Sequence, residues 1–148
     1  MKVNFDIKDN IALKFEGHYI DLHNNFKFIG FDYNVNEREL KMSWTKSNGD
    51  WVKENELSSL ILTHKLITFL TITYPERKEN FDDDKCLGEI TFFPSSSREI
   101  NDCMMEHSKP NQGDDILYFF ENGQLIRIHC EQIDLCINLP TKFQTTIF

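Results

Sequence analysis

The sequence lacks features that several classes of protein require. It has a single alanine, Ala12, among 148 residues. This scarcity argues against a helical bundle, because alanine is the strongest helix former. The longest apolar stretch, Leu66 to Tyr74, is interrupted by threonines and is too short to cross a bilayer, so we expect no membrane contact. Residues 1–6 contain no apolar signal-peptide segment, so we expect a cytoplasmic protein.

Basic residues are also in short supply. Lys and Arg number 16 against 24 Asp and Glu, which gives a net charge of −8. Nucleic-acid binding needs clustered cationic side chains to neutralise phosphates, and no such cluster occurs, so nucleic acid is excluded as a partner. The densest acidic run, Glu76 to Asp84, includes Asp82, Asp83 and Asp84. An acidic surface attracts a basic protein partner, although the run would also serve solubility alone.

The spacings that mark common catalytic and metal sites are missing. There is no Cys-x-x-Cys, His-Glu-x-x-His or Gly-x-Ser-x-Gly and no glycine-rich phosphate loop. His18, Asp21 and His23 come nearest to a ligand cluster, but His18 and His23 would face opposite sides of a strand. We therefore expect no metal and no cofactor, favour a non-catalytic protein, and expect the four cysteines to be reduced thiols.

Alternating apolar residues, typical of strands, are plentiful. Two such runs around a turn at residues 34–37 predict a hairpin with one apolar face, and the place of Trp44 in the second run favours its burial in the core. The runs are Ile29, Phe31, Tyr33 and Val35, then Leu40, Met42 and Trp44. Trp51 falls outside this alternation, so we expect it to be partly exposed.

Further strands follow along the chain. Residues 60–74 predict two strands separated by a turn, the second buried on both faces, and residues 87–93 predict another. The alternation changes parity near residues 131–132, which requires a bulge or a turn before a last strand. Residues 11–15 fit either a strand or a helical turn, and residues 141–148 are expected to form a loosely held tail.

One segment carries a helix signal. Ser96 and Glu99 match a capping box, with Ser96 as the N-cap residue. The residues that follow place apolar side chains on one helical face at Ile100, Cys103, Met104 and His107. The pattern predicts a short amphipathic helix over residues 97–107.

The strongest local signal is a hairpin turn at Asn122-Gly123. This pair favours a two-residue type I′ turn, which would place Phe119 opposite Ile126 and bury both. The core face would then hold Leu117, Phe119, Ile126, Ile128 and Cys130. The opposite face, with Tyr118, Arg127 and His129, would either lie under a helix or meet a partner.

Three segments carry a loose resemblance to known proteins. They are Phe15 to Leu22, Asp32 to Trp44 and Phe120 to Ile128. Together they resemble small bacterial β-rich proteins, including predicted immunity proteins of polymorphic toxin systems. The resemblance implies an inhibitor that covers a basic partner such as a nuclease toxin, and it supplies no catalytic residues.

The sequence thus predicts one domain over residues 1–148, of the α+β class and mainly antiparallel β. Its strands would form a single curled sheet or a sandwich of hairpins with one short helix. The function expected is that of a non-catalytic acidic protein-binding domain, and the alternative is a small-molecule-binding or hydrolytic domain with a site in the curl of the sheet. The candidate partner-binding residues are Trp51, Asp82, Asp83, Asp84, Tyr118, Arg127 and His129.

Overall fold

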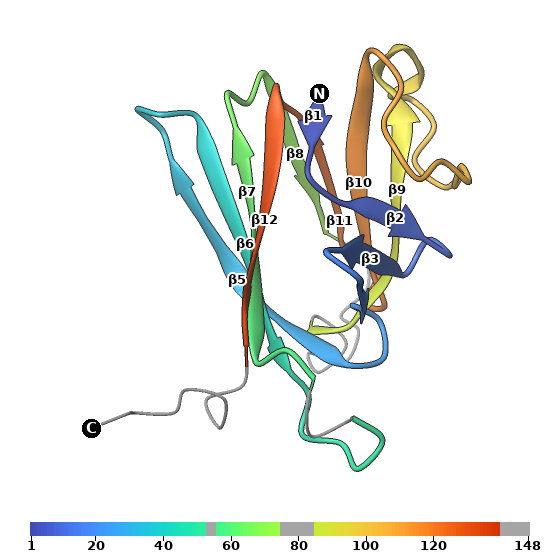
Figure 1. Ribbon diagram of the computed structural model, residues 1–148. Helices are drawn as coiled ribbons and strands as arrows, with labels where there is room; N and C mark the ends of the chain where they lie inside the picture. Colours follow the sequence, from blue (N-terminus) through green and yellow to red (C-terminus); the bar gives the residue numbers. More distant parts are fainter. Residues whose placement is uncertain (53–55, 75–84, 140–148) are drawn as a thin grey trace.

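The computed structural model describes residues 1–52, 56–74 and 85–139, and these form three open sheets with hardly any helix. Two of the sheets face each other, and the third is a small meander packed at one end (Figure 1). Nearly all the strand pairs are antiparallel, as predicted from the sequence; the exception among the described strands is the parallel pair β1–β12.

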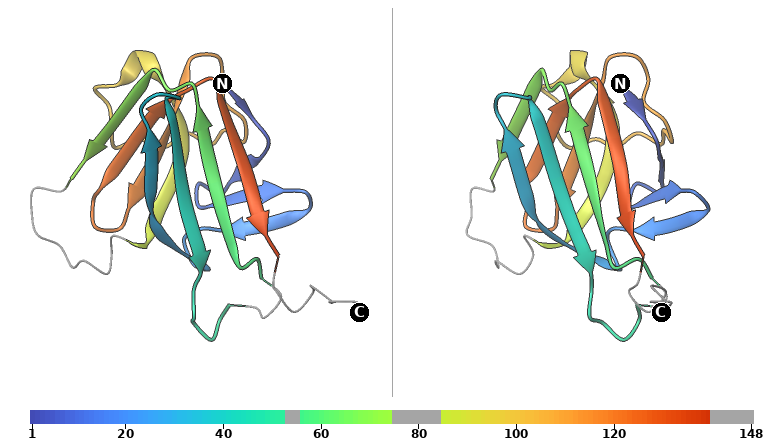
Figure 2. Two further views of the ribbon diagram at one scale, coloured as in Figure 1. Left: turned by 90° about the vertical axis from the view of Figure 1, so that its left-hand side faces the viewer. Right: turned by 60° about the vertical axis from the view of Figure 1, so that its left-hand side comes forward.

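The larger sheet has five strands in the order β1-β12-β7-β6-β5. Their bounds are β1 Lys2–Val3, β12 Gln132–Asn138, β7 Ser59–Lys65, β6 Glu39–Lys46 and β5 Phe26–Asn34. The predicted hairpin at residues 34–37 is confirmed as the β5–β6 pair. Figure 2 shows this sheet from its outer side, with β5 at one edge.

The second sheet has four strands in the order β8-β11-β10-β9. Their bounds are β8 Phe69–Thr73, β11 Leu125–His129, β10 Asp114–Phe120 and β9 Leu87–Pro94. The meander contains β2 Asp6–Lys8, β3 Ala12–Phe15 and β4 His18–Asp21, so residues 11–15 are extended rather than helical. The parity change near residues 131–132 is a turn at which the chain passes from the second sheet to the first.

Large aromatic side chains join the two facing sheets. The Phe28 ring, on β5, lies 5.0 Å from the Trp44 ring on β6 and 4.9 Å from the Phe120 ring on β10, centroid to centroid. Trp44 is fully buried, as its place in the alternation predicts. Aromatic rings bury large apolar areas, so these contacts stabilise the packing of the two sheets against each other.

A buried polar pair also crosses the core. His64 on β7 donates its Nδ1 proton to the Leu40 carbonyl oxygen at 2.9 Å, and its Nε2 accepts a hydrogen bond from the Tyr118 hydroxyl at 2.7 Å. Both side chains are completely buried, so water cannot reach their polar atoms. These two hydrogen bonds therefore satisfy groups that would otherwise have no partner. Burial lowers the pKa of His64 to about 4, although its bond to the Leu40 carbonyl acts in the other direction.

The β10–β11 hairpin exists, but its predicted register is wrong. Phe119 lies opposite Leu125 rather than Ile126. The Phe120 amide donates to the Gln124 carbonyl at 2.9 Å, and Gly123 has a φ of 92°, so the turn has three residues and a left-handed glycine. Tyr118 therefore points into the core opposite Ile126, and Phe119 is half-buried on the outer face.

The predicted helix over residues 97–107 is also absent. The segment contains only a 3-10 turn, Ser95–Ser97, with Pro94 as its N-cap residue and no capping hydrogen bond from a side chain. Tertiary bonds replace helical ones: the Ile100 carbonyl accepts from Arg127, and the Met105 amide donates to the Thr91 hydroxyl. The helical part of the predicted α+β class is thereby reduced to a turn.

Four apolar residues of the predicted hairpin face are exposed, three of them on β5 and Val35 in the turn that follows it. Ile29, Phe31, Tyr33 and Val35, which we call the β5 strip, are 62%, 42%, 40% and 72% exposed. The register shifts between Phe28 and Gly30, and beyond this bulge the β5–β6 hairpin leans away from the second sheet (Figure 1). The strand β8, predicted to be buried on both faces, is instead a half-exposed edge strand.

The buried His64 makes stability depend on pH. In the unfolded chain histidine has a pKa of about 6.5, whereas the pKa of His64 in the fold is about 4. Between these two pKa values the unfolded state binds a proton on this histidine and the native state does not. The free energy of unfolding, at its full value above pH 6.5, should therefore fall by about 3 kcal/mol as the pH drops through 4. His64→Gln should flatten the slope of unfolding free energy, measured in urea, between these two pH values.

The exposed His18 provides the control, because His18→Gln removes a histidine without emptying the core. Its slope should be steeper than that of His64→Gln, because it keeps the buried His64. Equal slopes for His64→Gln and the parent would contradict the neutral buried state of His64.

Candidate functional site

The residues predicted to contact a partner do not form one surface. Trp51 is 68% exposed, as expected from the sequence. Tyr118 and Arg127 are buried, so this fold does not expose their side chains to a partner. Asp82, Asp83 and Asp84 lie outside the described residues.

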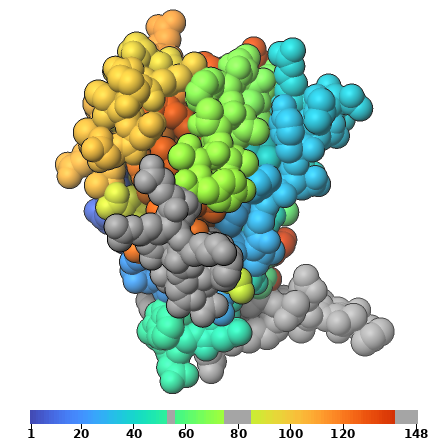
Figure 3. Space-filling model, turned by 180° about the vertical axis from the view of Figure 1, so that it is seen from behind, coloured from blue at the N-terminus to red at the C-terminus, as the bar shows by residue number. Residues whose placement is uncertain are grey.

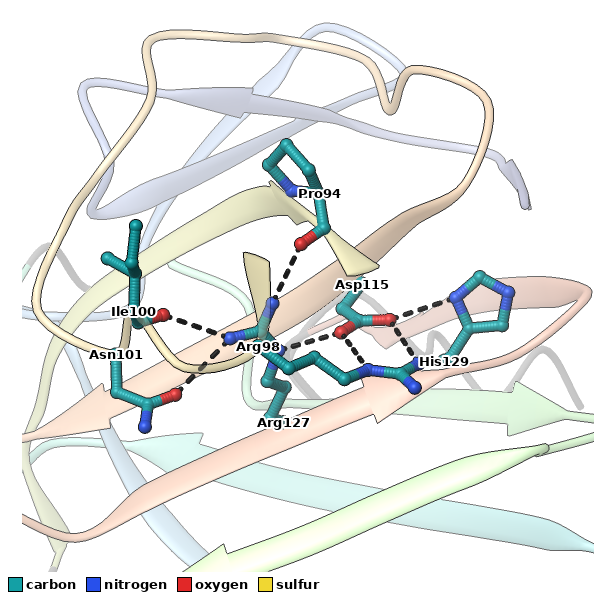
Figure 4. A network of polar contacts seen from close by, with 7 residues as sticks. All are labelled: Pro94, Arg98, Ile100, Asn101, Asp115, Arg127 and His129. Carbon is teal, nitrogen blue, oxygen red and sulfur yellow. Dashed lines mark hydrogen bonds and ion pairs between the residues drawn. The ribbon is translucent and has the colours of Figure 1, made fainter. Parts of the chain in front are cut away.

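Arg127 and His129 belong instead to a polar network centred on Asp115 of β10 (Figure 4). The Asp115 Oδ2 atom accepts hydrogen bonds from Arg127 Nε at 2.7 Å and from Arg98 Nε at 3.0 Å. Its Oδ1 atom accepts from Arg98 Nη2 at 3.0 Å and from His129 Nδ1 at 2.9 Å. The register of the β10–β11 hairpin brings these groups together, because it turns Asp115, Arg127 and His129 to the same outer face.

The remaining donors of Arg127 hold the loop that follows β9. Its Nη2 donates to the Pro94 carbonyl at 2.9 Å, and its Nη1 donates to the Ile100 carbonyl at 3.1 Å and to Asn101 Oδ1 at 3.2 Å. Arg98 adds a cation–π contact, with its guanidinium carbon 3.6 Å from the centre of the Phe69 ring. The network thus binds residues 94–101 to the sheet, which is a structural role.

Asp115 is the charge that balances the two arginines. Burial alone would raise the pKa of Asp115, but the hydrogen bonds and charges of Arg98, Arg127 and His129 outweigh burial and hold it below the ordinary value. His129 and Asp115 resemble two members of a catalytic triad. However, within the described ranges no hydroxyl or thiol is hydrogen-bonded to the His129 ring, so a nucleophile is missing.

The β5 strip is a second candidate surface. Phe31 and Tyr33 lie opposite the buried Met42 and Leu40, so they continue the inner face of the sheet beyond the part that the second sheet covers. Figure 3 shows the β5–β6 hairpin, in blue to cyan, standing out beside β8, in green. Phe31 and Tyr33 are neighbouring exposed aromatic side chains on one face of β5, and exposed apolar neighbours mark interaction surfaces more often than isolated residues do.

A third feature lies at the end of the sandwich where β9 begins. A hollow of about 280 Å³ is lined by His23, Phe26, Lys27, Trp51, Lys85 and Cys86, among others. The Trp51 ring is held there by a hydrogen bond from its Nε1 to the Asn24 carbonyl at 2.8 Å. The side chains of His23, Cys86 and Glu121 meet beside this hollow.

Sequence reasoning missed this last cluster because its members are far apart in the chain. Cys86 lies 63 residues after His23, and Glu121 comes from the β10–β11 turn. The sequence-based cluster grouped His23 with His18 and Asp21 instead, and no local spacing would have pointed to Cys86.

The chain matches no protein-family model, no curated protein and no solved structure. In the described part of the chain no helix is long and apolar enough to span a membrane.

Loss of the Asp115 charge should destabilise the fold strongly. Asp115→Asn leaves the fully buried Arg127 without a counter-charge, and breaking a buried ion pair in this way costs about 3–5 kcal/mol. The matched control is Asp134→Asn, which removes the partner of Lys65 in an ion pair of 2.8 Å at the surface. That change should cost less than about 1 kcal/mol. Urea unfolding of both variants measures the difference, and equal losses would contradict the structural role of Asp115.

Proposed function

We propose that this chain is a non-catalytic protein-binding domain that docks its partner along the β5 strip. The exposure of Ile29, Phe31, Tyr33 and Val35 carries the proposal. Phe31 and Tyr33 stand on the part of β5 that pairs with β6, so these two side chains are presented in a fixed geometry, while Ile29 lies at the bulge and Val35 in the turn beyond β5. A rigid apolar surface loses little conformational entropy on binding.

The position of β5 supports strand addition as the mode of binding. Among the described strands β5 pairs on one side only, with β6, and forms the edge of the larger sheet. Edge strands in most proteins are shielded by charges, proline or short length, since they otherwise recruit another strand. β5 has nine residues and alternating apolar side chains, so it offers both backbone hydrogen bonds and side-chain contacts to an added strand.

The charge of the chain indicates what kind of partner would be attracted. A net charge of −8 favours encounter with a basic protein and disfavours anionic ones. Long-range attraction mainly raises the association rate, whereas apolar contacts such as those of the β5 strip slow dissociation. The particular form we propose is an immunity-type inhibitor of a basic partner such as a nuclease toxin, whose cleft must attract phosphate.

Protein binding is favoured over hydrolysis because of the groups around the Asp115–His129 pair. The Asp115–His129 pair lacks a hydrogen-bonded nucleophile in the described ranges, and its carboxylate is occupied by two arginines. Small-molecule binding stays the second candidate, since two hollows of about 480 Å³ fall within the range of about 300–1,000 Å³ usual for ligand pockets.

Shortening the most exposed apolar side chains of the strip should weaken docking. Ile29→Ser with Val35→Ser removes two anchors that contribute little to the core, so the fold should persist while affinity for the partner falls about 10–100-fold. The experiment is affinity capture from the cells that make the protein, followed by dissociation constants for each retained basic protein.

A control variant carries the same kind of change elsewhere. Met104→Ser with Leu139→Ser shortens two exposed apolar side chains that lie outside β5, and it should bind like the parent. The association rate of the parent should fall as salt is raised. Equal affinity for the β5 and control variants, or capture of acidic proteins only, would refute the proposal.

A further inference from the structure

Three side chains of the kinds that bind zinc meet at one end of the sandwich. His23 Nδ1 lies 3.8 Å from Cys86 Sγ and 3.6 Å from Glu121 Oε1, and the three atoms all lie within 4.8 Å of one another. We propose that His23, Cys86 and Glu121 bind one divalent transition-metal ion of the zinc type. This inference is independent of the proposed docking surface.

The distances are close to those of a tetrahedral site. Zinc lies about 2.3 Å from a cysteine sulfur and about 2.0–2.1 Å from histidine nitrogen or carboxylate oxygen. With tetrahedral angles, these bonds place sulfur about 3.6 Å from nitrogen, and nitrogen about 3.3 Å from oxygen. The two distances exceed these values by a few tenths of an ångström, and rotation of the His23 ring away from the Leu87 carbonyl would complete the site.

The backbone holds the three ligands in place. The Glu121 amide donates to the Cys86 carbonyl at 2.9 Å, which ties the β10–β11 turn to the start of β9. His23 reaches the same strand from the β4–β5 connection, where its Nδ1 donates to the Leu87 carbonyl at 2.8 Å. The bond between the Glu121 and Cys86 backbones can persist when an ion binds, so these two ligands are joined beforehand, which lowers the entropic cost of forming the site.

An ion can bind to His23 only if the hydrogen bond from its Nδ1 to the Leu87 carbonyl breaks. Nδ1 must release its proton to serve as a ligand, and the neutral ring does so by moving the proton to Nε2. The Leu87 carbonyl then loses its donor, and the His23 ring must turn away from it, because that oxygen lies in the direction in which Nδ1 would meet the ion. Cys86 must also lose its thiol proton, so binding one ion releases one proton to solvent.

The donor set indicates the class of metal. One sulfur, one imidazole nitrogen and one carboxylate oxygen suit zinc and related transition metals, whereas calcium and magnesium require oxygen ligands. The His23 and Glu121 side chains are 32% and 46% exposed, so an ion can enter from solvent. Three protein ligands leave one position for water, the arrangement of catalytic rather than closed structural zinc sites.

The test is titration of the full chain, purified without an affinity tag, with Co²⁺ and then Zn²⁺. Co²⁺ should bind one ion per chain and produce the sulfur-to-cobalt absorption band of a thiolate ligand, and Zn²⁺ should displace it. Cys86→Ser should remove that band. His23→Gln and Glu121→Gln should each weaken Zn²⁺ binding at least about tenfold, measured by competition with a chromogenic chelator.

Matched controls use the exposed residues of the same types. Cys136→Ser and His18→Gln should bind both metals like the parent, since neither residue belongs to the cluster. Native-like urea unfolding of each variant shows that lost binding does not reflect lost folding. Absence of the thiolate band in the parent, or its loss in Cys136→Ser but not in Cys86→Ser, would overturn the proposal.

Discussion

The register of the β10–β11 hairpin governs the arrangement of the whole second sheet. A left-handed Gly123 ends a three-residue turn and places Tyr118 opposite Ile126. A shift of one residue in a strand reverses the face of every side chain it carries. With the observed register Tyr118 reaches His64 across the core, and Asp115 points outward to Arg127.

The same register explains how residues 94–101 come to cover the outer face of the second sheet. Arg127 is buried there under residues 94–101, and its charge is balanced by Asp115. A loop fastened by a buried ion pair takes the place of the helix that commonly covers a sheet. The exposed apolar surface lies instead on β5, where the hairpin extends beyond the opposing sheet.

The sequence predicts well which residues form strands, and poorly which side chains of a strand are buried. Period-two alternation identified the β5–β6 hairpin and the burial of Trp44, because a strand pattern depends only on neighbouring residues. The exposure of the β5 strip depends on which strand lies opposite, and the choice between a two-residue and a three-residue turn at Gly123 depends on packing. The capping box at Ser96 failed because Arg127 competes for the backbone of the segment that follows.

The candidate sites were still harder to predict. His23, Cys86 and Glu121 meet only because the β4–β5 connection, the start of β9 and the β10–β11 turn share one end of the sandwich. Arg127 and His129 were correctly placed on one face of their strand. The sequence alone, however, does not show whether a polar face is covered by a loop or exposed to solvent.

Hydrogen exchange of the β5 amides, followed with and without the captured basic partner, tests the central claim of docking by strand addition most directly. Amides that are hydrogen-bonded to an added strand exchange only when the complex opens, so exchange along Phe26–Asn34 should slow on binding. The amides of β9 and β10 should exchange at unchanged rates. Protection confined to the loop over Arg127, with β5 unaffected, would contradict a docking surface on this edge.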